Sequence, residues 1–148
     1  MAEKLVPFKY VPGKSLDVAI VKSLTKKDGK ARRGLKIMID RNRGNCLACH
    51  FVSVIHAKLD VNNPATRDEY GSQGTLGPSL DDVAKRYSTG ELRAILVNPQ
   101  AAFPNQDTVM PPYYMVGDFV RVIPECKNRA VLSASDIEDV LAYLGTLK

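Results

Sequence analysis

The chain contains no tryptophan and few aromatic residues, with six tyrosines and four phenylalanines among 148 residues. Little aromatic mass is therefore available to fill a core, and a large apolar cofactor is a reasonable candidate for that space. No stretch approaches the roughly 18 to 20 consecutive apolar residues that a membrane-spanning helix needs. Internal repeats, low-complexity runs and an obvious linker are also missing, so the length fits one domain with a real core.

Acidic residues are outnumbered by basic ones, which gives a formal net charge of +5. Apolar content of 45% and charged content of 25% are typical of an ordinary soluble globular protein. Several basic residues fall between Lys22 and Arg43. Such a surface can attract an acidic partner or simply maintain solubility. Because no aromatics are interleaved and no binding module fits, we expect no nucleic-acid partner.

The first residues, Met1-Ala2-Glu3-Lys4, show neither the apolar segment nor the cleavage site of a secretory signal. If the protein is exported, its signal has been removed. Residues 1–13 contain Pro7, Pro12 and Gly13, and we expect them to form an extended arm. A short helix is predicted over residues 15–24, capped by Ser15 and with apolar residues at helical spacing.

A second helix is predicted over residues 31–43. Leu35, Met38 and Ile39 recur at helical spacing, and Gly44 is expected to stop the helix just before two cysteines.

The middle of the chain should contain much irregular structure. Residues 57–78 are polar and broken by glycine and proline, which predicts a long loop. Short helices are predicted over residues 80–87 and 90–98. Residues 98–130 contain five prolines and should be largely irregular.

The last helix has the clearest signals. Ser135 and Glu138 are spaced as a capping box, and an apolar stripe follows at i, i+3, i+4 and i+7 from Ile137. The predicted fold is therefore all-α, with short helices and long loops.

Cys46-Leu47-Ala48-Cys49-His50 has the C-x-x-C-H spacing of c-type haem attachment. Two thiols separated by two residues reach the two vinyl groups of one porphyrin and form thioethers. The adjacent histidine then projects its imidazole under the iron. We therefore predict one covalent haem c, held by Cys46 and Cys49, with His50 as an axial ligand.

Two other uses of a cysteine pair are conceivable. A structural zinc ion needs four ligands, and beyond the pair the chain offers only His50, His56 and Cys126. A thioredoxin-like redox pair should follow a strand in a βαβ pattern, which does not occur here. Covalent haem is favoured over both.

Candidates for the second axial ligand are His56 and the four methionines. His56 lies six residues after the first ligand and would have to wrap around the porphyrin edge. Met38 lies on the apolar stripe of a predicted helix and is expected in the core. Met110 precedes Pro111-Pro112, which holds it extended. We predict Met110 as the ligand, with Met115 as the alternative. Ligation by histidine and methionine favours electron transfer at a raised potential.

Residues 31–148 resemble the class I cytochrome c family. The shared features are a first core helix with Gly34, the C-x-x-C-H motif, Gly-Pro-x-Leu, a Met-Pro loop and a last helix bearing Tyr143. In that family the first and last helices cross where a small residue meets an aromatic one, which implies a contact between Gly34 and Tyr143. The expected architecture is an all-α, class I cytochrome c-like domain over residues 31–148 around one haem, with an N-terminal extension over residues 1–30.

Three residues near the Gly-Pro-x-Leu turn are candidates for supporting the haem. A neutral His50 should donate its second ring N–H to a carbonyl group, and the backbone of Pro78 is the candidate, partly from the resemblance. Arg86 and Tyr87 follow this turn and could hydrogen-bond a haem propionate. An exposed arginine and a core tyrosine are the alternative.

A closer resemblance is to the SoxX family, the mono-haem subunits of SoxAX cytochromes in bacterial sulfur oxidation. It is carried by the phrase Arg-Gly-Asn-Cys-Leu-Ala-Cys-His over residues 43–50, Gly-Pro-Ser-Leu over residues 77–80, and Met-Pro-Pro-Tyr over residues 110–113. The resemblance implies a periplasmic complex with a SoxA-type subunit, which has its own haem and an active-site cysteine.

Such a complex oxidatively couples thiosulfate to a cysteine of a SoxYZ-type carrier, as an L-cysteine S-thiosulfotransferase. The resemblance implies that this chain is the non-catalytic redox subunit, with no catalytic residue of its own, and that it passes electrons to a soluble acceptor. Some of these complexes include a small third subunit, which the resemblance leaves open here. A free-standing electron carrier is the alternative function, and a haem-free zinc or structural module is a third.

Three further residues have roles that stay open. Cys126 is left over once haem takes two thiols, and an inert thiol is favoured over a disulfide with another chain or a reactive group. Tyr113 and Tyr114 are expected to pack over the methionine side of the haem or to lie at an interface.

Overall fold

The computed structural model describes residues 4–70, 73–117 and 127–148. Within these ranges the regular structure is helical, apart from one isolated β-bridge between Val11 and Ala19. The all-α prediction is therefore confirmed for this part of the chain, and none of its helices is long and apolar enough to cross a membrane. Cys126, predicted to be an inert thiol, lies outside the described residues.

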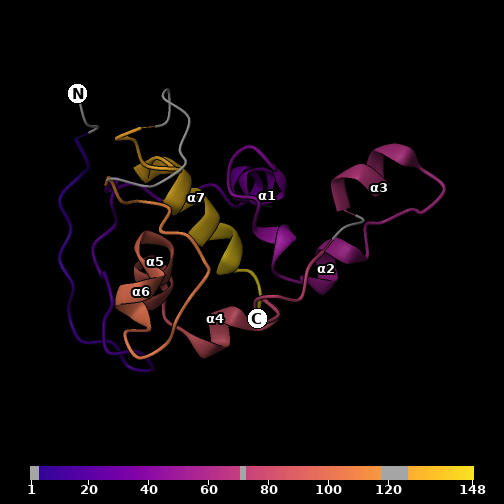
Figure 1. Cartoon of the computed structure of the whole chain (residues 1–148). Coiled ribbons are helices and arrows are strands. Elements are labelled where there is room, and N and C mark those ends of the chain that lie inside the picture. Colours follow the sequence, from indigo (N-terminus) through magenta and orange to yellow (C-terminus); the bar gives the residue numbers. More distant parts are fainter. Residues whose placement is uncertain (1–3, 71–72, 118–126) are drawn as a thin grey trace.

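The helices, shown in Figure 1, are α1 (Ala31–Ile39), the 3₁₀ helix η1 (Cys46–Ala48), α2 (Ser53–His56), α3 (Pro64–Tyr70), α4 (Val83–Arg86), α5 (Thr89–Val97), α6 (Pro99–Ala102) and α7 (Ala134–Leu144). The short helices α4 and α5 lie where the sequence predicted them. The proline-rich segment after them is irregular where described, except for α6.

The crossing of α1 and α7 forms the centre of the core (Figure 1). A Cβ atom on Gly34 would overlap the carbonyl group of Asp139 and lie 2.9 Å from the Cα of Val140. The two backbones can approach this closely because glycine has no side chain. The predicted partner of Gly34, Tyr143, lies one turn further along, and the nearest atoms belong to Asp139 and Val140 instead.

Helix α1 ends at Ile39 and not, as predicted, at residue 43. Asp40 is extended (φ −65°, ψ 115°), and its carbonyl accepts the N–H groups of Arg43 (3.1 Å) and Asn45 (3.0 Å). The Gly44 N–H donates to the carbonyl of Ile37 at 3.1 Å. Residues 41–45 therefore form a compact turn, although arginines are good helix formers.

The predicted helix over residues 15–24 does not form. The backbone N–H groups of Ser15 and Leu16 both donate to the carboxylate of Glu91, which is almost fully buried. Burial by itself raises the pKa of Glu91, but hydrogen bonds from Ser88, Leu16 and Ser15 outweigh this effect and hold the pKa at about 2. The first N–H groups of a helix have no partner within it, so the Glu91 carboxylate occupies the place that the predicted Ser15 cap would have taken.

A buried ion pair anchors the following residues. Arg93 Nε lies 2.8 Å from Glu138 Oε1, and the two side chains are only 6% and 7% exposed. Arg93 also donates to the carbonyl of Ile20 at 2.6 Å, and Glu138 accepts the N–H of Leu24 at 2.9 Å. Residues 20–24 are thereby fixed against α5 and α7.

The segment predicted as a long loop contains helix α3. Pro64 occupies the first helical position, where its missing N–H costs nothing, and the Asn63 side chain accepts the N–H of Ala65 at 3.1 Å. None of the residues of α3 is buried, and Figure 1 shows the helix projecting away from the other helices. The loop prediction is therefore wrong for residues 64–70.

Helix α7 begins two residues earlier than its predicted capping box. Ser133 accepts the Asp136 N–H and Asp136 accepts the Ser133 N–H, each at 3.1 Å. The predicted pair of Ser135 and Glu138 is wrong because the Glu138 carboxylate is bound by Arg93. Both pairs have the right spacing, and the tertiary contact decides between them.

We expect Gly34→Ala to destabilise the protein by about 1–3 kcal/mol, because the new methyl group would force α1 and α7 apart. Gly145→Ala is the matched control, since its Cβ would lie 3.4 Å from the nearest atom and its φ is −61°. Denaturant unfolding of the two variants measures the difference. Equal midpoints would contradict the proposed close crossing.

Candidate functional site

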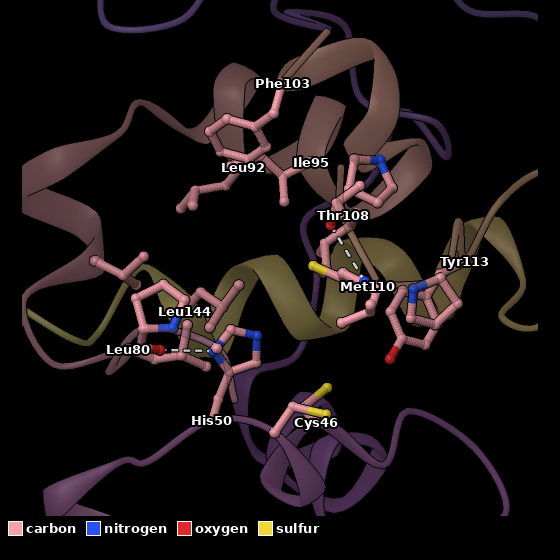
Figure 2. A pocket seen from close by; sticks show the side chains of 18 of the residues that line it. Cys46, His50, Leu80, Leu92, Ile95, Phe103, Thr108, Met110, Tyr113 and Leu144 are labelled. Atoms are coloured by element: carbon pink, nitrogen blue, oxygen red, sulfur yellow. Dashed lines mark hydrogen bonds between the residues drawn. The ribbon is translucent and has the colours of Figure 1, made fainter. Parts of the chain in front are cut away.

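A cavity of about 460 Å³ lies between the cysteine segment and the C-terminal half of the chain. Its volume is within the range of roughly 300–1,000 Å³ that is usual for ligand pockets. Figure 2 shows apolar side chains such as Leu92, Ile95 and Leu144 around it. The residues that the sequence favoured for holding the cofactor all line this cavity: Cys46, Cys49, His50, Pro78, Arg86, Tyr87 and Met110.

The two thiols are brought to the cavity by a tight turn. Asn45 takes a left-handed conformation (φ 49°), and the N–H groups of Cys49 and His50 donate to the carbonyl of Cys46 at 3.2 and 3.0 Å. Burial raises the pKa of the Cys46 thiol to about 12, so the free thiol is protonated at neutral pH. In the described residues, no three His, Cys, Asp or Glu side chains cluster as a metal site.

The imidazole of His50 is fixed from two directions. Its Nδ1 atom lies 2.6 Å from the carbonyl oxygen of Pro78, the group that the sequence singled out for this bond. If neutral His50 donates from Nδ1, its Nε2 lone pair is available to a metal. A Cβ on Gly77 would lie 2.7 Å from Nδ1 and 2.9 Å from Nε2, so the glycine backbone lies directly against the ring.

The loop carrying Gly77 is fastened to the cysteine segment. The Gly77 N–H donates to the carbonyl of Cys49 at 2.8 Å, and the Leu80 N–H donates to that of Phe51 at 2.9 Å. These two bonds place residues 77–80 beside residues 49–51, which makes the contact between His50 and Pro78 a consequence of backbone pairing.

Met110 reaches the cavity from another segment. Figure 2 shows its side chain entering from the side opposite the cysteine turn and His50. Its backbone N–H donates to Thr108 Oγ1 at 3.2 Å. The alternative ligand Met115 is not part of the lining.

Two other candidates for the second axial ligand, Met38 and His56, lie where the sequence predicted them, in the core and on the surface. Met38 is fully buried in α1 and contributes to the cavity wall. His56 is exposed on α2, with its ring 5.4 Å from that of Phe51, and it does not line the cavity.

Arg86 and Tyr87 lie at the rim of the cavity. The Arg86 guanidinium donates to the carbonyl of Ser79 at 2.5 Å and lies 5.9 Å from the Tyr87 ring centre. A guanidinium has five N–H donors, so donors remain for an anionic group at the rim. Tyr87 is half-buried.

Tyr113 has a contact that the sequence did not predict. Its hydroxyl donates to the carbonyl of Gly44 at 2.8 Å, and its side chain is buried beside the cavity. Burial raises the pKa of this phenol, which keeps it protonated and able to donate. The sequence shows an aromatic after two prolines, but not the residue that its hydroxyl reaches.

These residues fit a covalently attached haem. Two thiols lie on one side of an otherwise largely apolar cavity, with an imidazole beside them and a thioether entering from the other side (Figure 2). The glycine at position 77 leaves room for the imidazole ring. This donor set matches the requirements of an iron porphyrin with histidine and methionine ligation.

Comparisons with known proteins agree with this arrangement. The cytochrome c family model matches residues 31–148. The chain is also similar to a chain in the crystal structure of SoxXA from P. pantotrophus, with 32% sequence identity, a TM-score of 0.73, and coverage of 95% of this chain and 94% of that one. Since 95% is covered, most of the first 30 residues are included. Comparison with curated proteins gives no significant match.

We expect Gly77→Ala to displace the His50 ring and break its hydrogen bond to Pro78, because the added methyl group would overlap the ring atoms. The slowly exchanging Nδ1 proton of His50 should disappear from the NMR spectrum of the mature protein. Ser79→Ala, a substitution in the same loop, removes a 3.3 Å bond to the Phe51 carbonyl and a 3.1 Å bond from the Asp81 N–H. Neither bond involves the imidazole, so this variant should retain the proton. An unchanged proton in Gly77→Ala would contradict the packing described.

Proposed function

The chain belongs to the cytochrome c family, with one covalently bound haem c, an electron-transfer role and similarity to SoxX, and from this premise we propose that it is the electron-transfer subunit of a SoxAX-type complex. The complex would oxidatively couple thiosulfate to a cysteine of a carrier protein. The observation that carries this proposal is that two thiols, an imidazole and a thioether line the same cavity. The similarity to SoxXA over nearly the whole chain supplies the context.

Each residue of the cavity has a separate task in this proposal. Cys46 and Cys49 would form the two thioethers and His50 would offer Nε2 to the iron, while the Pro78 carbonyl accepts the proton of Nδ1. Met110, which lines the same cavity, would supply a thioether to the iron. A haem held by these residues would supply one-electron redox chemistry.

The reaction of the complex releases two electrons. Thiosulfate and a carrier thiol form a new S–S bond, giving a cysteine S-thiosulfonate, one proton and two electrons. This chain makes and breaks no bond in that reaction. It removes the electrons one after the other and passes them to a soluble acceptor.

The mouth of the cavity is suited to a protein partner. Leu76 and Val109 are 72% and 79% exposed, the two highest values among the exposed large apolar side chains of the described residues, and both line the cavity. Exposed apolar side chains gathered at a functional site commonly mark an interaction surface. We propose that a SoxA-type subunit covers this mouth, in the periplasm, with the carrier and the acceptor binding transiently.

We expect Met110→Ala to lose the weak red charge-transfer band of the ferric protein, because this band reports a bond between iron and a thioether. Met115→Ala is the control and should keep the band, since Met115 does not line the cavity. Absorption spectra of the two haem-loaded variants decide the point. The opposite pattern would make Met115 the ligand.

The proposed function predicts a stable heterodimer when the protein is purified from its source. In that complex, thiosulfate together with the carrier protein should reduce the haem of this chain, and omission of either should leave it oxidised. Size-exclusion chromatography and absorption spectra measure both results. A monomer that thiosulfate and carrier never reduce would instead favour a free-standing electron carrier.

A further inference from the structure

We propose that Tyr113 is a positioning residue that couples the loop bearing Met110 to the turn bearing the two cysteines. The inference rests on the proposed ligation of iron by Met110. A single hydroxyl group would hold the cysteine turn and the Met110 loop in a fixed position relative to each other, although the two segments are far apart in the sequence.

The first link is the side chain. The Tyr113 hydroxyl donates to the Gly44 carbonyl at 2.8 Å, inside the protein, with the residue only 7% exposed. Gly44 lies two residues before Cys46, and its own N–H donates to Ile37 at 3.1 Å. Movement of Tyr113 therefore acts on the connection between α1 and the cysteine turn.

The second link is the backbone. The Tyr113 N–H donates to the carbonyl of Leu96, at the end of α5, and its carbonyl accepts the N–H of Leu132, each at 3.0 Å. Only Pro111 and Pro112 separate Tyr113 from Met110, and proline fixes φ near −65°. Because this connection is stiff, a displacement of Tyr113 would also displace Met110.

Tyr114 provides a contrast within the same segment. Its hydroxyl accepts the N–H of Val6 at 2.9 Å, and its ring lies 6.4 Å from that of Phe8. It is also buried but holds the N-terminal arm instead of the cysteine turn. Tyr113→Phe and Tyr114→Phe each remove one buried hydroxyl. A comparison of the two variants therefore distinguishes a general loss of packing from loss of the proposed coupling.

The experiment uses added imidazole as a competitor for the position held by Met110 in the ferric, haem-loaded protein. Tyr113→Phe should bind imidazole about tenfold more tightly than the wild type, because a larger fraction of molecules has Met110 detached. Tyr114→Phe should stay within about twofold of the wild type, since its hydroxyl does not contact either ligand-bearing segment. Met110→Ala gives the upper limit of affinity.

The outcomes are distinguishable. Equal affinity in Tyr113→Phe and the wild type would overturn the coupling, while Met110 remains the ligand. Wild-type affinity as high as that of Met110→Ala would overturn ligation by Met110 and this inference with it, but would leave electron transfer within a complex untouched.

A measurement on the wild type avoids dependence on the folding of a variant. Because coupling is reciprocal, imidazole should speed hydrogen exchange at the amides of Tyr113 and Leu132, whose bonds pass through Tyr113. The Val6 amide, bound to Tyr114, should be unaffected. Unchanged exchange at Tyr113 and Leu132 under saturating imidazole would overturn the proposal.

Discussion

The close crossing of α1 and α7 is the constraint on which the rest of the structure depends. It requires glycine at position 34, where a side chain would overlap the backbone of α7. The crossing fixes α1, whose end leads through a short turn to the cysteines, and it also places Val140 and Leu144 of α7 in the cavity lining. A shift of either helix would therefore move the thiols and the opposite wall of the cavity relative to each other.

The residues before α1 are held by buried charges rather than by a helix of their own. Glu91 binds the amides at residues 15 and 16, and the pair of Arg93 and Glu138 binds residues 20–24. Removing one partner of a buried pair leaves an unpaired charge, which commonly costs about 3–5 kcal/mol. The extension is thus part of the folded unit, and Tyr114 also connects its arm to the segment after Met110.

The two proposed iron ligands are held in different ways. His50 is clamped by the Pro78 carbonyl and the Gly77 backbone, and both belong to a loop hydrogen-bonded to the cysteine segment itself. Met110 stands on a proline-stiffened loop, and its place depends on contacts with distant parts of the chain. The methionine side is therefore the side on which single side chains, such as Tyr113, can decide the geometry.

The sequence by itself determined the chemistry of the site and the helical class of the fold. The C-x-x-C-H spacing, the Gly-Pro turn and the Met-Pro loop are local patterns, and the structure brings their residues to one cavity. The apolar stripe of the last helix was also readable. The sequence could not show which contacts form where a local helix or capping pattern competes with side chains from distant parts of the chain. Residues 15–24 have a helical apolar pattern but bind Glu91 and Arg93 instead, and Glu138, spaced as a cap, pairs with Arg93. The reason is that backbone amides and carboxylates bind whichever partner folding brings to them, and only the tertiary structure decides which partner that is.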